Sequence, residues 1–430
     1  MSGYGLLEKR LARALDAAPG IRNIVKSVYQ RVNYIRHHQA DFQYELNGPF
    51  AIQTPDEWAG VAGGPSGADT VYFGYYDKSP WSRNMRYMAY HRLRRDGEAE
   101  ICAVDKQAGT MKVLAATQAY NHQQGSMTQW LPDDRLIFNT LDGRELVSCI
   151  VTTDGEKEIV PWPIQTVHPD GREALTLNYK RIDRLRAEYG YPMPVSNYGP
   201  HMPDSADGIW RIDLAAKRSD LLLSIEQLRR MQPRPEMERS EHKVNHIMYS
   251  PSGARYVFMH RWIGAQGKFS RLYAGTTDGK EPKLLLDDRM VSHYQWRDDE
   301  HLLAWARTAA DGDRYYAINV MTGKLAIIGK DELDRFGDGH PSYSPDKRWI
   351  VTDTYPDKAR QRHLMLYDTA EHKLVKVGRF FSPWKFDGAV RCDLHPRWSP
   401  DGRWLSIDSA HDGTRKTYCI DVSAVTRGGE

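Results

Sequence analysis

The sequence contains few cysteines and no long apolar segment. Only four cysteines occur in 430 residues, far apart and without Cys-x-x-Cys spacing, so reduced and buried thiols are expected. No apolar run approaches the ~20 residues that a bilayer-spanning helix needs. The N-terminus also lacks the apolar stretch of a signal peptide. These absences favour a cytoplasmic protein.

The chain also lacks a strong net charge. A formal charge of +3 is small for 430 residues, and it argues against a protein that binds nucleic acid in bulk. Aromatic residues are instead abundant, with 12 Trp and 24 Tyr, which suits β-structure. This length fits two or three ordinary domains or one large repeat domain.

The first 45 residues differ from the rest of the chain. Apolar residues recur at three- and four-residue steps over residues 5–36, and Pro19-Gly20 divides this stretch into two helices. Arg and Lys occupy much of the opposite face. We therefore predict a basic amphipathic helical arm over residues 1–45. It would bind a membrane surface or a partner, or pack on its own domain or on a second subunit.

A repeat begins near residue 70. Short apolar-alternating runs are separated by turns such as Asp142-Gly143 and Asp401-Gly402, which are hairpin signals. Seven units of about four strands indicate a β-propeller. They start near Tyr76, Gln129, Val167, Asn245, Ser292, Gly339 and Leu394.

The predicted fold is therefore all-β: a seven-bladed β-propeller over residues 46–430 with an N-terminal α-helical arm. The third unit contains an insert at about 179–207, which we expect to cover one face. The last unit has only three strands, so a strand near 70–73 is expected to complete it and close the ring.

A histidine recurs at one position of the repeat. His246, His293, His340 and His395 are 47, 47 and 55 residues apart, and each lies three residues before an aromatic residue. Equivalent positions of a repeat are equivalent positions in space, so the four imidazoles should meet at one mouth of the central channel.

Such a cluster suits a transition metal, because neutral imidazole is its commonest protein ligand. Asp393 lies two residues before His395, and Asp338 lies two residues before His340, so each aspartate should share a strand face with its histidine. A histidine that does not bind the metal could act as a base.

These segments resemble the oligogalacturonate lyases, cytoplasmic seven-bladed propellers of pectin breakdown, over most of residues 70–425. The similarity is clearest in Asn245-His246-Ile-Met-Tyr, Phe258-Met-His260-Arg261-Trp262, Ser292-His293-Tyr-Gln-Trp, Gly339-His340-Pro-Ser-Tyr and Asp393-Leu-His395-Pro-Arg-Trp. The chain departs from the family at Asp393, where the family has a histidine, and at Val390, where it has a glutamine. The helical arm and the insert are also outside the family pattern.

The resemblance implies a lyase that cleaves a uronic-acid-containing glycan by metal-assisted β-elimination. It implies a divalent ion, Mn first, with Zn, Ni or Ca as alternatives, held by His340, His395 and Asp393. His293 would be a further ligand or the catalytic base, and His246 the other candidate base. Arg261 would bind the substrate carboxylate.

Further candidates for substrate binding lie on other blades. They could bind sugar hydroxyls by hydrogen bonds or ring stacking, and they are Tyr75, Tyr76, Asp77, Lys78, His122, Tyr198 and His201. If the protein acts at the inner membrane surface, the basic arm is the expected attachment.

Two other classes of function stay open. A glycosidase needs two carboxylates beside the scissile bond, for which Asp77, Asp338 and Asp393 are available, and a glycosyltransferase is a related alternative. A non-catalytic propeller that binds a glycan or a protein is the second class. Only a lyase would release an unsaturated sugar.

Overall fold

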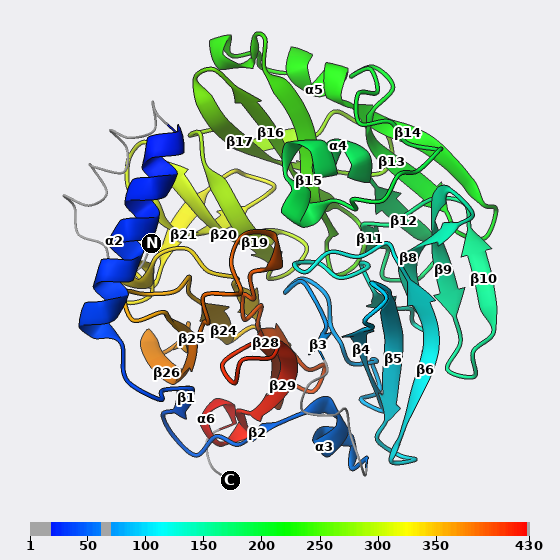
Figure 1. Ribbon diagram of the computed structural model, residues 1–430. Coiled ribbons are helices and arrows are strands. Elements are labelled where there is room, and N and C mark those ends of the chain that lie inside the picture. The colour runs from blue at the N-terminus through cyan, green and yellow to red at the C-terminus, as the bar shows by residue number, and fades with distance from the viewer. Residues whose placement is uncertain (1–18, 62–69, 428–430) are drawn as a thin grey trace.

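The computed structural model describes residues 19–61 and 70–427. Seven antiparallel sheets follow one another along the chain and stand around a ring (Figure 1), so the predicted seven-bladed propeller is confirmed. We number these blades 1 to 7 in chain order. In each blade the first strand is the inner one.

The first three blades have four strands each. Blade 1 consists of β3 (Val71–Tyr72), β4 (Tyr87–Leu93), β5 (Ala99–Asp105) and β6 (Thr110–Thr117). Blade 2 consists of β7 (Gln129–Trp130), β8 (Leu136–Asp142), β9 (Glu145–Val151) and β10 (Lys157–Val160). Blade 3 consists of β11 (Thr166–Val167), β12 (Glu173–Thr176), β13 (Gly208–Asp213) and β14 (Arg218–Ser224).

The next two blades are built in the same way. Blade 4 consists of β15 (Glu241–Tyr249), β16 (Tyr256–Gly264), β17 (Gly267–Gly275) and β18 (Lys283–Leu286). Blade 5 consists of β19 (Val291–Trp296), β20 (His301–Thr308), β21 (Gly312–Asn319) and β22 (Leu325–Ile328). Helix α5 (Ile225–Arg230) and the 3-10 turn Pro235–Met237 connect blades 3 and 4.

The last two blades take strands from the N-terminal part of the chain. Blade 6 consists of β23 (Ser342–Tyr343), β24 (Trp349–Asp353), β25 (Gln361–Asp368), β26 (Lys373–Phe381) and β1 (Tyr44–Leu46). Blade 7 consists of β27 (Arg397–Trp398), β28 (Trp404–Ser409), β29 (Lys416–Asp421) and β2 (Ile52–Gln53). Short helices α3 (Pro55–Ala59) and α6 (Ser423–Thr426) lie beside blade 7, and 3-10 turns occupy Asp334–Phe336 and Gly388–Val390.

Strand β2 closes the ring, and the expectation that residues 70–73 would do so is wrong. Ile52 pairs with Ile420 of β29, whereas Val71 and Tyr72 form the inner strand of blade 1. The apolar pattern of residues 70–73 fits either the outer strand of blade 7 or the inner strand of blade 1. The segment is buried on both faces, as an inner strand requires, and the half-buried β2 is suited to an outer edge.

The repeated aromatic residue joins neighbouring blades. The indole N–H of Trp296 donates to Met248 O of blade 4 at 3.3 Å, and that of Trp398 donates to Ser342 O of blade 6 at 3.3 Å. Trp130 donates in the same way to Pro80 O at 2.7 Å. Apolar clusters fill the spaces between the blades. The aromatic residue of the repeat therefore stabilises the contact between blades.

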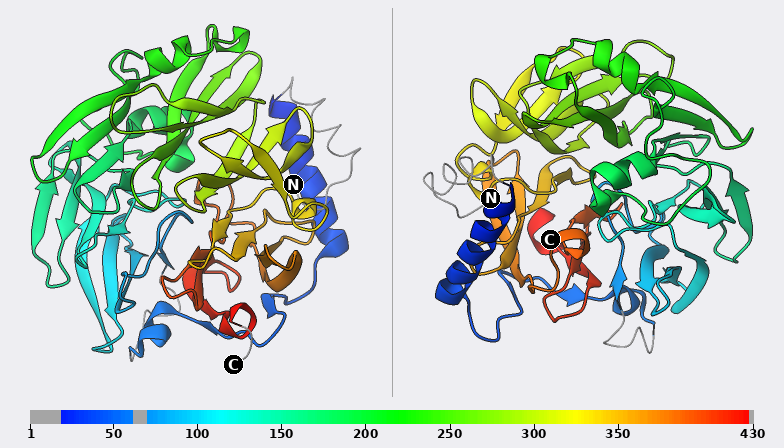
Figure 2. Two further views of the ribbon diagram at one scale, coloured as in Figure 1. Left: turned by 180° about the vertical axis from the view of Figure 1, so that it is seen from behind. Right: turned by 45° about the horizontal axis from the view of Figure 1, so that its top comes forward.

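Helix α2 (Pro19–His37) is the described part of the expected arm, and residues 1–18 lie outside the described residues. It lies at the outer edge of the ring beside blade 6 in both views (Figures 1 and 2). Tyr34 packs edge-on against Trp384 at 5.7 Å and stacks on Phe381 at 6.2 Å. No helix within the described ranges is long and apolar enough to cross a membrane.

The insert lies between β12 and β13 and contains α4 (Tyr179–Leu185) and the 3-10 turn Ala187–Tyr189. Asn178 caps α4 by accepting from Lys180 N and Arg181 N. Asp207 accepts a hydrogen bond from Arg181 Nε at 2.5 Å and thereby ties the two ends of the insert together. α4 contacts β15, and Figure 1 shows it in front of that strand, so the insert covers one face as expected.

His91 links blades 1 and 2 and shows what an ordinary buried histidine does here. Its Nε2 lies 2.8 Å from Ser126 Oγ and its Nδ1 lies 3.3 Å from Tyr72 O. Burial lowers the pKa of His91 from 6.5 to about 4. The folded protein therefore keeps this ring neutral at pH values where the unfolded chain protonates it.

We expect the stability that neutral His91 contributes to be complete above pH 6.5 and to be lost as the pH falls toward 4. Between pH 7 and pH 5 the loss should amount to about 2 kcal/mol for this one group. Urea unfolding of the wild type and of His91→Gln at both pH values measures it. Between these pH values the free energy of unfolding of His91→Gln should fall by about 2 kcal/mol less than that of the wild type. Equal decreases in the two proteins would contradict this role of His91.

Candidate metal and glycan site

The four repeated histidines lie together in the channel. The ring centroids of His293 and His340 are 4.2 Å apart, those of His340 and His395 are 4.3 Å apart, and those of His246 and His293 are 6.4 Å apart. All four side chains are buried, with exposed fractions between 1% and 7%. The convergence expected from the repeat is therefore present in the fold.

Local backbone irregularities turn these side chains into the channel. His246 lies at a bulge in β15 and His293 at a bulge in β19. His340 and His395 stand in the loops just before β23 and β27. His246 and His395 have φ angles of 54° and 45°, in the left-handed region that side chains rarely adopt. Such strain is typical of functional positions.

Glycine makes room for His340. The backbone at Gly339 passes so close to blade 6 that a Cβ there would lie 2.0 Å from Asp353 O. This approach lets His340 N donate to Asp353 Oδ1 at 2.8 Å, and the same oxygen lies 2.8 Å from His340 Nδ1. The main chain and the imidazole are thus both held by one carboxylate.

Three of the four imidazoles are oriented through Nδ1, each by a different acceptor, whereas His246 meets the Tyr75 hydroxyl through Nε2. His340 uses Asp353, His395 uses Gly74 O at 2.9 Å, and His293 uses Asp338 Oδ1 at 2.9 Å. The expected pairing of Asp338 with His340 is therefore wrong, because the aspartate reaches across to the neighbouring blade. Such contacts leave Nε2 as the nitrogen that is available for a ligand or a proton.

His340, Asp393 and His395 form a possible metal-binding group. Each offers one ligand atom, and these atoms all lie within 4.8 Å of one another. The buried Nε2 atoms of His340 and His395 have no hydrogen-bond partner among the described residues. Two free imidazole nitrogens beside a carboxylate fit Mn, Zn or Ni. His293 is adjacent to this group but is not part of it.

Asp393 carries its charge deep in the channel. Burial alone would raise its pKa, but Arg362 and Arg391 outweigh burial and hold the pKa of Asp393 well below its usual range. Arg362 lies 2.7 Å from Oδ1, and Arg391 donates to Oδ2 at 2.7 Å. Both arginines and Asp353 were missed from the sequence, because no repeat position marks them.

The pKa values of His246, His293 and His395 are all lowered, so these three rings are neutral at pH 7. Burial, and then the neighbouring His340, holds the pKa of His395 well below its usual range. Burial, and then the charge of Arg261, does the same for His246. Burial also lowers the pKa of His293, although Asp338 opposes the shift. Neutral rings can bind a metal or accept a proton without first losing one.

Two tyrosines lie between the imidazoles. Tyr75 stacks on His246, with centroids 4.9 Å apart and an interplanar angle of 2°, and its hydroxyl lies 3.1 Å from His246 Nε2. Tyr76 meets His340 at 5.3 Å, and its hydroxyl donates to Tyr294 O at 2.8 Å. Both tyrosines were candidates for sugar binding from the sequence, at the mouth of the first blade.

The other predicted residues lie at different depths. Asp77 and Lys78 form a buried ion pair of 2.5 Å next to Tyr76. His122 is half-buried, and its carbonyl accepts from Arg415, which also binds the carbonyl of Arg391. Tyr198 of the insert packs against Trp210 of β13, and His201 is exposed, so neither joins the histidine cluster.

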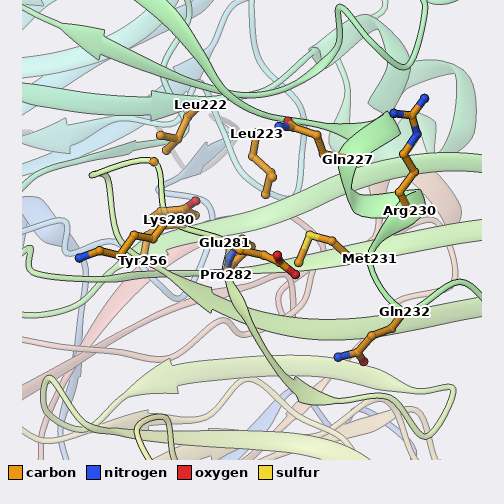
Figure 3. Close-up of a pocket in the computed structure, with 11 residues that line it drawn as sticks. Leu222, Leu223, Gln227, Arg230, Met231, Gln232, Tyr256, Lys280, Glu281 and Pro282 are labelled. Carbon is orange, nitrogen blue, oxygen red and sulfur yellow. The ribbon is translucent and has the colours of Figure 1, made fainter.

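A separate pocket opens between blades 3 and 4 (Figure 3). It measures about 470 Å³ and is lined by β14, α5 and the turn before β18, including Leu223, Arg230 and Glu281. Strands β14 and β18 are the outermost strands of blades 3 and 4, so this pocket is on the rim of the ring. It is separate from the histidine cluster.

The fold and the site define a seven-bladed propeller with a buried histidine–carboxylate cluster. No protein-family model and no curated protein sequence matches the chain. Among solved structures, its fold is similar to an oligogalacturonate lyase in complex with manganese (TM-score 0.58, 15% identity, 89% of this chain and 98% of that one). The predicted resemblance to these lyases is therefore confirmed at the level of the fold.

Two further structures show the same architecture. An oligogalacturonate lyase from Vibrio parahaemolyticus has a TM-score of 0.59 at 11% identity, over 89% of this chain and 99% of that one. The β-propeller domain of the trilobed protease from Pyrococcus furiosus has a TM-score of 0.50 at 10% identity, over 82% and 96%. Propellers of quite different proteins are thus also similar to this one.

We expect chelator-treated protein to bind one Mn²⁺ per chain through His340, His395 and Asp393. A ligand at 100 times its dissociation constant stabilises the folded state by about 2.7 kcal/mol, so added Mn²⁺ should raise the melting temperature. His340→Ala and His395→Ala should abolish this rise. His301→Ala, at the start of β20 and outside the histidine cluster, is the matched control and should keep it. Equal responses in all variants would remove the metal assignment.

Proposed function

We propose that the protein is a cytoplasmic lyase that cleaves a uronic-acid-containing glycan by metal-assisted β-elimination. The observation that supports this most is the meeting of four buried imidazoles with a buried carboxylate. Manganese in a structurally similar lyase agrees with the ligand set. Binding of glycan without cleavage would not require a free base beside a metal group.

The reaction begins with removal of the C5 proton, which is weakly acidic because it is alpha to a carboxylate. His293 is our candidate base. Asp338 holds its Nδ1, and Ser292 Oγ donates to the other oxygen of Asp338 at 2.6 Å. The proton passes to Nε2, and the new imidazolium is stabilised by the aspartate beside it.

The electrons of the broken C5–H bond then form the C4–C5 double bond while the C4–O4 bond breaks. The leaving oxygen needs a proton, and the Tyr75 hydroxyl beside His246 is a candidate donor. Burial raises the pKa of Tyr75 well above its usual value, so it is protonated at pH 7. Tyr75 would regain a proton from solvent after each turnover while the His293 imidazolium releases the one taken from C5, and His246 is the alternative base.

Charge that develops on the substrate carboxylate must be neutralised. A divalent ion held by His340, His395 and Asp393 would supply positive charge to that group. Arg261 on β16 is the candidate carboxylate clamp from the protein. Its Nη2 donates to Val291 O at 3.2 Å, and its Nε has no hydrogen-bond partner among the described residues.

We expect His293→Ala to lower turnover by about 10²- to 10⁴-fold, the usual contribution of a general base. The assay follows the ultraviolet absorbance of the unsaturated product on a panel of uronic-acid oligosaccharides, with and without chelator. Asp338→Asn should retain more activity than His293→Ala and shift the pH profile. Cleavage without an unsaturated product would instead show a glycosidase, and unchanged activity in His293→Ala would remove this histidine from the chemistry.

We also propose that α2 attaches the protein to the inner membrane surface. Val28, Val32 and Ile35 form a stripe along this helix with exposed fractions of 57%, 41% and 71%. Basic residues, among them Arg31 and Arg36, are exposed on the same helix. Buried apolar area and attraction to anionic lipid together hold such helices at an interface.

Vesicles with anionic lipid should therefore sediment the wild-type chain, and neutral vesicles should do so weakly. The double variant Val28→Asp/Ile35→Asp should lose this binding, because two charges would enter the apolar stripe. Val113→Asp, at an exposed valine of β6, is the control and should bind as the wild type does. Dimerisation that disappears in the double variant, without any vesicle binding, would show that a second copy covers α2 instead.

A further inference from the structure

Lys243 is buried without a partner next to the candidate active site. Its side chain lies on β15, three residues before His246, and the residue is 2% exposed. Nζ has no hydrogen-bond partner among the described residues. An unpaired cation in the interior is costly, so a position like this needs a reason.

A second cation faces Lys243 across the sheet. Lys243 and Arg261 are direct partners in the β15–β16 register, which places both side chains on the same face. Like charges directly opposite one another destabilise a strand pair. Burial, and then the charges of Arg261 and Arg186, lowers the pKa of Lys243 to about 6.

A third cation comes from the insert. The Arg186 guanidinium lies 4.3 Å above the ring of Tyr189, and that ring meets His246 edge-on at 5.7 Å. Glu188, which lies 4.0 Å from Arg186 Nε, opposes the positive potential at Lys243. Three basic side chains, Lys243, Arg261 and Arg186, thus lie close together, and the Lys243 amine is largely neutral at pH 7 until an anion binds beside it.

Two more buried polar atoms on this sheet face have no hydrogen-bond partner among the described residues. They are Nε of Arg261 and Oδ1 of Asn245, the latter two residues after Lys243 on the same strand. Arg261 and Arg186 are partly exposed, so the site opens on their side. An anion would accept hydrogen bonds from the basic side chains. A hydroxyl next to that anion would donate a hydrogen bond to Asn245 Oδ1.

We propose that Lys243, Arg261 and Arg186 form a binding site for the carboxylate of a sugar acid, with Asn245 accepting from an adjacent hydroxyl. Only the placement of this site beside the reacting sugar rests on the proposed function. The insert supplies Arg186, so it acts as a specificity element as well as a cover. A neutral sugar leaves the cations unpaired and is rejected.

The test uses sodium galacturonate as the probe, with metal-free full-length protein and titration followed by calorimetry or NMR. The monosaccharide has no O4-linked sugar to eliminate, so it reports binding alone and is independent of lyase activity. Lys243→Met should weaken binding about tenfold or more, since a hydrogen bond to a charged group is lost. Arg186→Met should weaken it similarly, and Lys268→Met, a nearby exposed lysine, should leave it unchanged.

A second measurement separates a binding role from a structural one. Lys243 Nζ is a buried polar group without a hydrogen-bond partner among the described residues, so Lys243→Met removes its desolvation cost and should raise the melting temperature of the ligand-free protein. Galactose and sodium phosphate are the other probes. The proposal is overturned if Lys243→Met binds galacturonate as the wild type does, if phosphate binds more tightly than galacturonate, or if galactose binds equally well.

Discussion

Apolar packing between neighbouring blades closes the sheets into a ring, and ring closure forces the inner strands to share one channel. The indoles of Trp296 and Trp398 reinforce this packing by donating to the preceding blade. Because every blade presents the same strand position at the same height, side chains separated by about 50 residues of sequence become neighbours. The four histidines depend entirely on this constraint.

The side chains that line the channel are buried, and most of their charges are balanced in pairs. Asp353 and Asp338 each hold a histidine, and Asp393 meets two arginines. The pKa values of Asp338 and Asp393 are lowered, which keeps these two carboxylates ionised inside the protein. Two groups are not balanced in this way. The free nitrogens of His340 and His395 face Asp393, which suits a cation, and Lys243 Nζ and Arg261 Nε lack hydrogen-bond partners among the described residues, which suits an anion.

Much of this architecture could be predicted from the repeat. The seven blades, the insert over one face and the grouping of His340, His395 and Asp393 all follow from spacing, since spacing translates into position in a repeat fold. The strand that closes the ring could not be chosen, because residues 52–53 and 70–73 both read as short apolar segments. The partner of Asp338 was also missed, because alternation along one strand says nothing about a side chain that crosses to the next blade.

The sequence by itself determined the fold class, the approximate blade boundaries and the set of histidines that face the channel. It did so because periodic apolar and turn residues encode strands locally. Tertiary structure alone decided which nitrogen of each imidazole is free, which carboxylate each one meets, and that Arg186, Arg261 and Lys243 surround the same space. Those relations join residues from different blades, and they arise only when packing brings the blades together and water is excluded between them.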